Sequence, residues 1–291
     1  MAITASMVKE LRERTGAGMM ECKKALTEAD GNIETAIEEL RKRGAAQADK
    51  KAGRIAAEGL IVSASQDSES VLLEVNCETD FVAKDENFVG FAHLLGQAIL
   101  SQRPKNVAAL ALLVLDSGIT VEESRQNLIA KIGENISVRR FELLSAGEGK
   151  LSIYQHGARI AVAVLSSGGD EGLGRDIAMH VAASRPLCVS ADQVDPGTVE
   201  KERGIYLAQA EDSGKSPEIM EKMVEGRVRK FLGEVTLLGQ SFVKNPDLTV
   251  SKLLTSQKAT VSGFVRYEVG EGLEKKQDDF VAEVMAQAKG D

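Results

Sequence analysis

The spacing of apolar residues changes once along the chain, between residues 45 and 60, and this change most limits the possible folds. Before it, apolar side chains recur at helical spacing; Ile33, Ala36, Ile37 and Leu40 form one stripe. After it, residues that favour β-structure gather in short runs separated by polar turns. The sequence therefore predicts a helical N-terminal region followed by a mixed α+β region.

The helical region, residues 1–53, is predicted to be a bundle of three short helices with tight glycine turns. Asn32 is a suitable N-cap for the third helix, because its side-chain oxygen can accept a hydrogen bond from the first turn. Gly44 is expected to end that helix. The stretch 45–57 is rich in Ala and Lys and lacks a strong apolar stripe, so we interpret it as a linker that could be helical in part.

The order strand, polar loop, helix occurs twice, with strands that start at Val71 and Ile160, 89 residues apart. This repetition favours two similar subdomains, each an antiparallel sheet with helices on one face. The predicted strands cover 60–65, 71–77, 136–144, 151–156, 160–165 and 261–269.

Two cap-then-proline helix starts, Asp195-Pro196 and Ser216-Pro217, predict an antiparallel helical hairpin that projects as an arm. This hairpin could pack on its own core, on a second copy of the chain, or on another protein. A last helix is expected from about Asp278, with Phe280 on its apolar side.

Composition excludes several classes of protein. The 291 residues carry a net charge of −8, which argues against a general phosphate-binding surface. The longest uncharged apolar run, 107–115, is too short to span a membrane, and the charged N-terminus is unlike a signal peptide. Three widely spaced cysteines predict neither a disulfide framework nor a zinc site, so we expect a cytoplasmic protein without a cofactor or metal.

Motifs that resemble those of known enzymes are incomplete in this sequence. Gly214-Lys215-Ser216 resembles the end of a phosphate-binding loop, but the required earlier glycine is Gln209. An enzyme that uses Asp80 with His156, or a cysteine nucleophile, is the alternative from another class, but nothing in the sequence orients a base. We therefore expect no enzyme.

The polar loop 78–85 contains an apolar pair, Phe81 and Val82, beside Asp80. Phe81 could fold back under the following helix, or it could be exposed as a wedge for a partner. The adjacent pair Met19 and Met20 cannot both face one helix stripe, so at least one is expected to be partly exposed and the other could lie in the core.

Several long motifs closely resemble the elongation factor Ts family of bacteria, in the family's order and over essentially the whole chain. The hairpin turn 66–70 and the segment 102–117 match no block of the family. The motifs are KELRERTGAGMMECKKAL, EVNCETDFVAKD, KIGENISVRR, YQHGARIAV, DIAMHVAAS, EKMVEGRVRKF, GQSFVKNP and VRYEVGEG.

This resemblance implies a division into a ubiquitin-associated-like helical domain, a core of two subdomains, a helical arm and a C-terminal module. The corresponding residues are 1–53 for the helical domain, 54–139 for core subdomain N, 140–189 with 234–269 for core subdomain C, 190–233 for the arm and 270–291 for the module.

The resemblance also implies guanine nucleotide exchange: binding to elongation factor Tu, GDP-bound or nucleotide-free, without direct contact to nucleic acid or membrane. The loop Thr79, Asp80, Phe81 and Val82 would disturb the partner's magnesium site. Other implied contacts are Leu11, Met19, Met20 and Lys23 of the helical domain, Ile132 and Gly133 of the core, and His156, for which a turn role is equally suitable. A protein-interaction adaptor built on the helical domain remains the alternative function, and a homodimer through the hairpin is an open possibility.

Overall fold

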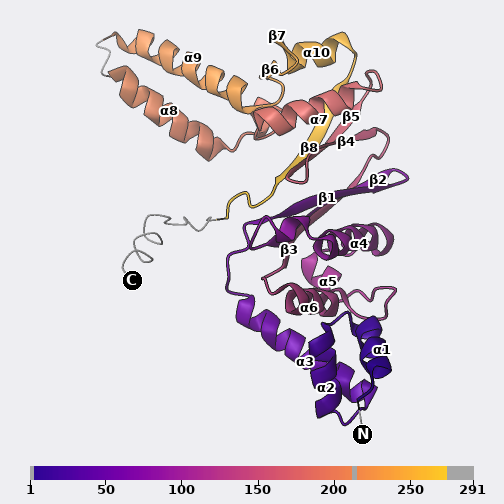
Figure 1. The fold of residues 1–291 in the computed structure, drawn as a ribbon. Helices are drawn as coiled ribbons and strands as arrows, with labels where there is room; N and C mark the ends of the chain where they lie inside the picture. Colours follow the sequence, from indigo (N-terminus) through magenta and orange to yellow (C-terminus); the bar gives the residue numbers. More distant parts are fainter. Residues whose placement is uncertain (1–2, 212–214, 274–291) are drawn as a thin grey trace. The chain divides into compact units, whose positions relative to one another are not determined.

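The computed structural model describes residues 3–211 and 215–273 and shows a mixed α+β protein with small sheets (Figure 1). The chain separates into two compact units, which we describe one at a time. Of the described residues, 3–62, 73–141 and 269–273 belong to the first unit, and 63–72, 142–211 and 215–268 belong to the second. The helix expected from Asp278 lies outside the described residues.

The helices and strands follow in the order helical bundle, first sheet, second sheet with its insertions. The first part holds α1 (Ala5–Thr15), α2 (Met19–Glu28), α3 (Ile33–Lys51), β1 (Glu58–Gln66), β2 (Glu69–Cys77), η1 (Val82–Lys84), α4 (Glu86–Gln102), α5 (Val107–Ala111), α6 (Val121–Ile132) and β3 (Ser137–Ser145). The second part holds β4 (Lys150–His156), β5 (Ile160–Ser167), α7 (Leu173–Ser184), η2 (Ala191–Gln193), α8 (Pro196–Glu211), α9 (Pro217–Val235), β6 (Ser241–Phe242), β7 (Asn245–Thr249), α10 (Val250–Ser256) and β8 (Thr260–Glu268).

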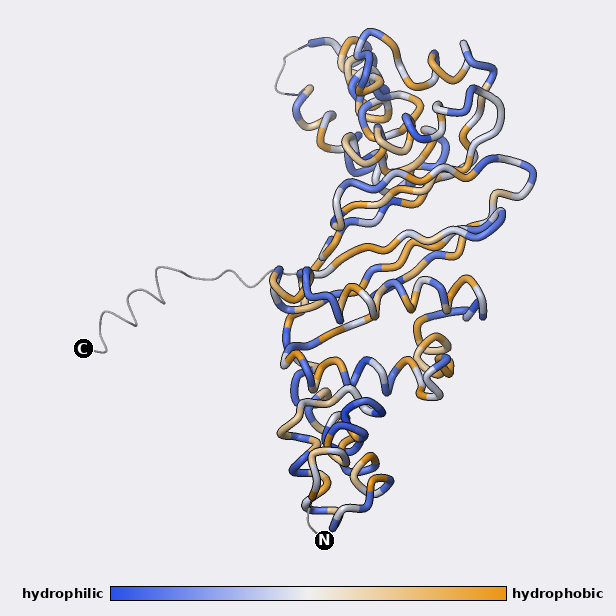
Figure 2. The backbone as a smooth tube through the Cα atoms, turned by 45° about the vertical axis from the view of Figure 1, so that its right-hand side comes forward, coloured by the Kyte–Doolittle hydropathy of each residue, from blue (hydrophilic) through white to orange (hydrophobic). Residues whose placement is uncertain are grey.

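The three N-terminal helices pack around one small core. The predicted cap Asn32 accepts a hydrogen bond from the Thr35 N–H at 3.1 Å and so starts α3. Hydrophilic and hydrophobic residues alternate in short stretches along these helices (Figure 2), as expected where each helix buries one face. The fully buried residues of this core are Leu11, Cys22, Ala25, Leu26 and Ala36.

Gly44 does not end α3, and the expected linker is mostly helix. The helix continues to Lys51 because residues 45–50 contain strong helix formers, including three alanines. Gly44 is buried against α6, and a Cβ there would lie 3.7 Å from the Asn127 side-chain oxygen. The helix formers after Gly44 and its contact with α6 together continue a helix that a glycine stop signal alone would end.

Strands β1, β2 and β3 form a three-stranded sheet in that order, and α4 lies beside it (Figure 1). Phe88, Leu95 and Ile99 recur at helical spacing on one side of α4 and are fully buried. Asp85 caps the helix by accepting hydrogen bonds from the N–H groups of Asn87 and Phe88, at 2.9 and 3.3 Å. The loop between β2 and α4 is thus fixed at its helical end.

The second unit holds a three-stranded antiparallel sheet in the order β4-β5-β8. Ala163 of β5 pairs with Ile153 of β4 on one side and with Val265 of β8 on the other. Val162 and Val164, on the opposite face of β5, belong to a core that includes Ile177 and Val181 of α7. The strand predictions are confirmed here to within a few residues at each end.

Two insertions separate β5 from β8 in the chain. Helices α8 and α9 form an antiparallel hairpin that extends away from the sheet (Figure 1), as the proline-marked helix starts predict. Its core holds Ala210, Val224 and Val228. The small β6–β7 hairpin and α10 were not predicted, because each is shorter than the window over which periodicity can be read.

Candidate partner-binding surface

The loop after β2 separates its two apolar residues. Val82 is 9% exposed and starts the short helix η1, whereas Phe81 is 81% exposed. Phe81 therefore does not pack beneath α4, and its ring is exposed in the free protein. Val82 thus anchors the loop in the core, and Phe81 lies at the exposed tip of the loop.

Asp80 stands beside Phe81 on the same exposed tip. Its carboxylate forms an ion pair with Lys84 at 2.8 Å, four residues along the chain. Both side chains are more than half exposed, so the pair contributes only about 0.3–0.5 kcal/mol. A partner could exchange this contact for its own at small cost.

Thr79 forms the base of the same turn. Its carbonyl oxygen accepts a hydrogen bond from the Ala83 N–H at 3.2 Å, and its hydroxyl oxygen accepts one from the Val82 N–H at 3.4 Å. The Cys77 thiol also donates to the Thr79 carbonyl, at 3.2 Å. Burial, with added repulsion from the Glu134 carboxylate, raises the pKa of the Cys77 thiol to about 12. Cys77 therefore stays protonated and is a structural donor rather than a nucleophile.

The start of α2 presents a second apolar surface. Met19 and Met20 are 60% and 74% exposed, so the expectation that one of them lies in the core is wrong. Both methionines are the first residues of α2, directly after its N-cap Gly18. Lys23 is also exposed, whereas Leu11 is fully buried in the core of the helical bundle. Leu11 is therefore not on this surface.

Ile132 and Gly133 lie at the end of α6 and are half-buried. Gly133 adopts φ of +90°, a left-handed conformation that favours glycine, and closes the helix through a hydrogen bond from its N–H to the Ile129 carbonyl. Its own carbonyl accepts a hydrogen bond from the ammonium group of Lys51, at the end of α3. The ends of α3 and α6 are thereby tied together.

His156 ends β4 and belongs to the second unit. It is exposed, and its Nδ1 lies 3.2 Å from the Tyr154 hydroxyl while the two rings stack with centroids 6.4 Å apart. This contact fixes the ring without a carboxylate that would make it a general base. It is compatible with either a turn role or a contact role.

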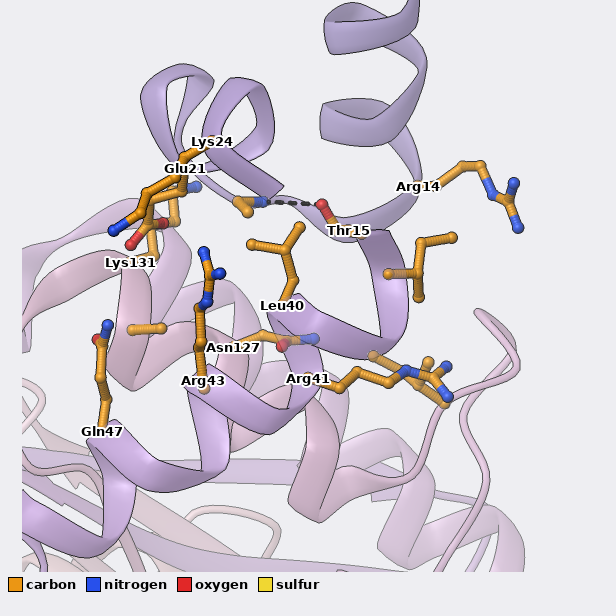
Figure 3. A pocket seen from close by; sticks show the side chains of 15 residues that line it. Arg14, Thr15, Glu21, Lys24, Leu40, Arg41, Arg43, Gln47, Asn127 and Lys131 are labelled. Carbon is orange, nitrogen blue, oxygen red and sulfur yellow. Dashed lines mark hydrogen bonds between the residues drawn. The ribbon is translucent and has the colours of Figure 1, made fainter. Parts of the chain in front are cut away.

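A cavity of about 220 Å³ lies between the α1–α2 turn, α3 and α6, all in the first unit (Figure 3). Thr15, at its edge, accepts a hydrogen bond from the Ala17 N–H at 3.3 Å. Three arginines line the cavity, but each forms an ion pair with a glutamate, so their charge is largely compensated. These pairs are Arg14 with Glu34, Arg41 with Glu123 and Arg43 with Glu28.

No group of three or more metal-ligating side chains occurs within residues 3–211 and 215–273. In the same ranges, no helix combines the length and the apolar character needed to cross a membrane. Among the exposed apolar side chains of the described residues, Phe81 lies on the loop after β2, and Met19 and Met20 lie at the start of α2. Such exposed apolar residues are typical of a protein that acts by binding another protein.

Comparison with known proteins shows the family to which this chain belongs. A sequence model of the family described as elongation factor TS matches residues 78–271. Elongation factor Ts from Thioalkalivibrio sulfidiphilus is 61% identical over the full length of both chains. The factors from Legionella pneumophila (strain Paris) and Methylococcus capsulatus are each 56% identical, over 99% of both chains. The chain belongs to the elongation factor Ts family.

Proposed function

We infer that this chain is a guanine nucleotide exchange factor for elongation factor Tu in translation elongation. It binds the GDP-bound partner, promotes GDP release and remains on the nucleotide-free form. Full-length identity with curated elongation factors Ts carries this conclusion. The adaptor alternative gains no support, because the full-length identity with elongation factor Ts covers the core as well as the helical domain.

The exchange activity requires no covalent chemistry and no cofactor of this chain's own. We place the protein in the cytoplasm, where translation elongation takes place. We also propose the finer domain division that the resemblance implies: a ubiquitin-associated-like domain at 1–53, a core of two similar subdomains, an arm at 190–233 and a C-terminal module at 270–291. A single buried cluster within α1–α3 supports the first of these. Residues 274–291 of the C-terminal module lie outside the described residues.

Phe81 is the proposed wedge at the partner's magnesium and phosphate site, with Thr79, Asp80 and Val82 as the rest of the loop. Its 81% exposure supports this role, because the ring meets no packed core that would hold it back. A bound Mg²⁺ is often the largest local charge in a nucleotide site, so displacing its ligands weakens GDP without any contact to the base. Burying one Phe contributes about 1.5–3 kcal/mol, which can distort a site but cannot by itself hold a partner.

The holding contacts are proposed to lie elsewhere. Met19, Met20 and Lys23 are exposed on α2, and Ile132 with Gly133 is accessible at the end of α6. Leu11 contributes only through the core of the helical bundle, and His156 is proposed to add a contact from the second unit. Remote contacts provide affinity, and the Phe81 loop converts part of it into distortion of the nucleotide site.

Thermodynamic linkage makes this coupling reciprocal. If this chain weakens GDP binding by some factor, GDP weakens this chain's binding by the same factor. A coupling of about 3 kcal/mol corresponds to about 150-fold. Excess GDP with Mg²⁺ should therefore dissociate the complex.

The projecting hairpin of α8 and α9 is a proposed site for a homodimer. Exposed apolar side chains along it, Ile205, Leu207 and Ile219, support an interface on this arm. Sedimentation of the chain at increasing concentration would test it, and a monomer at all concentrations would remove the proposal.

Release of a fluorescent GDP analogue from elongation factor Tu tests the exchange function. The chain should accelerate release strongly, and unlabelled GDP with Mg²⁺ should reverse complex formation. No acceleration by folded protein would contradict the proposed function.

A further inference from the structure

Two turns that are distant in the chain meet at the base of the Phe81 loop. One follows β2 and contains Glu78 and Thr79; the other follows α6 and contains Glu134 and Asn135. The Glu134 Oε2 atom accepts hydrogen bonds from the backbone N–H groups of Glu78 and Thr79, at 3.1 and 3.0 Å. Its Oε1 atom accepts one from the Thr79 hydroxyl at 2.7 Å. One carboxylate thus receives three donors from the start of the loop.

The contact is reciprocal. The Glu78 carboxylate accepts a hydrogen bond from the Asn135 N–H at 2.6 Å, and Arg54 lies 3.6 Å from its other oxygen. The Asn135 side chain donates in turn to the Arg54 carbonyl at 2.8 Å. Neither turn can shift without breaking charge-assisted hydrogen bonds, which are stronger than neutral ones.

Glu134 reaches the wedge only through Thr79. The Thr79 hydroxyl donates to Glu134 and accepts from the Val82 N–H, so one oxygen joins the brace to the turn that carries Phe81. Val82 is buried and anchors the other side of the tip. Phe81 itself has little packing of its own at 81% exposure, so its position depends on these two anchors.

We propose that Glu134 is a positioning residue for nucleotide exchange, which holds the Thr79–Val82 loop so that affinity for elongation factor Tu is converted into GDP release. This inference rests on the proposed exchange function. A rigid loop transmits force to the partner's magnesium site, whereas a loosened loop lets Phe81 yield while the remote contacts still bind. Loss of Glu134 should therefore slow the maximal rate more than it weakens binding.

The test measures release of a fluorescent GDP analogue over a range of concentrations of this chain. Glu134→Gln keeps the size of the side chain but turns one acceptor into a donor that faces donors. We expect its maximal release rate to fall about tenfold or more, the loss set by a charge-assisted hydrogen bond. The concentration that gives half the maximal rate should change by less than about threefold, and the thermal midpoint should show that the variant folds.

A double-mutant cycle distinguishes positioning from a general structural effect. Thr79→Val removes the hydroxyl and should slow the maximal rate, whereas Thr79→Ser keeps it and should restore most of the rate. The double variant Thr79→Val with Glu134→Gln should lose clearly less than the product of the two single losses, because both act through one contact. Glu142→Gln, an exposed glutamate on β3, is the matched control and should behave as the wild type.

Amide hydrogen exchange on the free protein adds a readout independent of the partner. The Glu78 and Thr79 amides should exchange faster in Glu134→Gln, since a neutral amide oxygen replaces the carboxylate that accepts from them. A folded Glu134→Gln variant with the wild-type maximal rate would overturn the inference while leaving the exchange function intact. The inference would also be overturned if Glu134→Gln changed only the concentration that gives half the maximal rate. The same holds if the rate loss of the double variant equalled the product of the two single losses. Failure of the wild type to accelerate release would overturn the proposed function and this inference together.

Discussion

Residues 78–85 and residues 168–172 occupy the same place in two strand–loop–helix segments, yet only the first presents a large apolar side chain. Each loop contains an aspartate whose Oδ1 accepts hydrogen bonds from N–H groups two and three residues further on, at the start of the next helix. Asp85 accepts from Asn87 and Phe88 before α4, and Asp170 accepts from Gly172 and Leu173 before α7. Both helices also end at an arginine with positive φ, Arg103 or Arg185, followed by proline. The two segments therefore share their local structure from loop to helix end.

The loops between these shared ends are built for different purposes. The second packs tightly on its own unit: a Cβ on Gly168 would lie 2.2 Å from the Lys258 carbonyl oxygen, so only glycine fits. The first is held at its base by Glu134 and leaves Phe81 exposed at its tip. A common scaffold thus supports one closed loop and one open loop, and function is expected to reside in the open one.

The largest expected difference concerns Phe81. Phe81→Ala should slow GDP release from elongation factor Tu by about 10- to 100-fold, since the truncated ring would contribute about 1.5–3 kcal/mol in the complex. Stability should not change, because the ring is exposed in the free protein. Glu171→Ala, an exposed residue of the second loop, is the control and should leave both quantities unchanged. Unfolding of Phe81→Ala at a lower temperature than the wild type would show that the ring packs in the core after all.

Gly168→Ala tests the closed loop, where a substitution should lower the stability of the protein. The new Cβ would collide with the Lys258 carbonyl at a residue with φ of +72°, so the unfolding free energy should fall by about 1–3 kcal/mol. Gly147→Ala, at φ of +54° with no atom within 4 Å, separates the collision from the backbone strain and should cost about 1 kcal/mol. If denaturant unfolding showed the same loss of unfolding free energy in both variants, the collision with the Lys258 carbonyl would contribute nothing.

The two caps should behave alike if the segments are equivalent. Asp85→Ala and Asp170→Ala should each lower the unfolding free energy by about 0.5–2 kcal/mol, because each leaves helix N–H groups without an acceptor. Asparagine at either position keeps an oxygen acceptor and should lose less. A large loss of unfolding free energy at one position with none at the other would show that the two segments are not equivalent.

The smallest expected effect is a pH dependence confined to the second unit. His180 of α7 is fully buried, whereas His93 of α4 is exposed. The Val243 N–H donates to His180 Nδ1 at 3.1 Å, and Nε2 lies 2.9 Å from the Gln240 side-chain oxygen, as suits a neutral ring. Burial lowers the pKa of His180 below its ordinary value of 6.5, although the Gln240 hydrogen bond opposes the shift.

The sign of this effect follows from proton linkage. Below pH 6.5 the unfolded chain binds a proton that the folded chain does not, so stability is complete above that pH and falls as the pH drops toward the folded pKa. Amide hydrogen exchange of α7 between pH 7 and pH 5, corrected for the intrinsic exchange rate, would measure it. His180→Gln should weaken the dependence and His93→Gln should retain it; a flat profile in the wild type would contradict the prediction.

Local patterns predicted most of the elements because their causes are local. The predicted cap Asn32 starts α3, and the strands of both sheets lie within a few residues of their predicted ranges. The capping box of Thr120 and Glu123, which starts α6, is a signal of the same local kind. Continuation of α3 past Gly44 was not predicted, because the contact of Gly44 with α6 cannot be read from local spacing.

The candidate site was predicted in part. An apolar pair in a polar loop marked Phe81 and Val82, but the sequence could not say which of two adjacent apolar residues would be buried. The exposure of both Met19 and Met20 was missed for a similar reason, since helical spacing allows either to face the core. In each case the choice depends on packing partners from elsewhere in the chain.

The sequence by itself determined the helix caps, the strand runs, the repeated strand–loop–helix order and the family, because hydrogen bonds within a turn and side-chain periodicity act over a few residues. Only the tertiary structure decided that Phe81 is exposed, that Leu11 is not, and that Glu134 holds Thr79 across 55 residues of chain. A carboxylate among the 44 acidic residues has no distinguishing local pattern. Its partners become defined only when folding brings two distant turns to the same place.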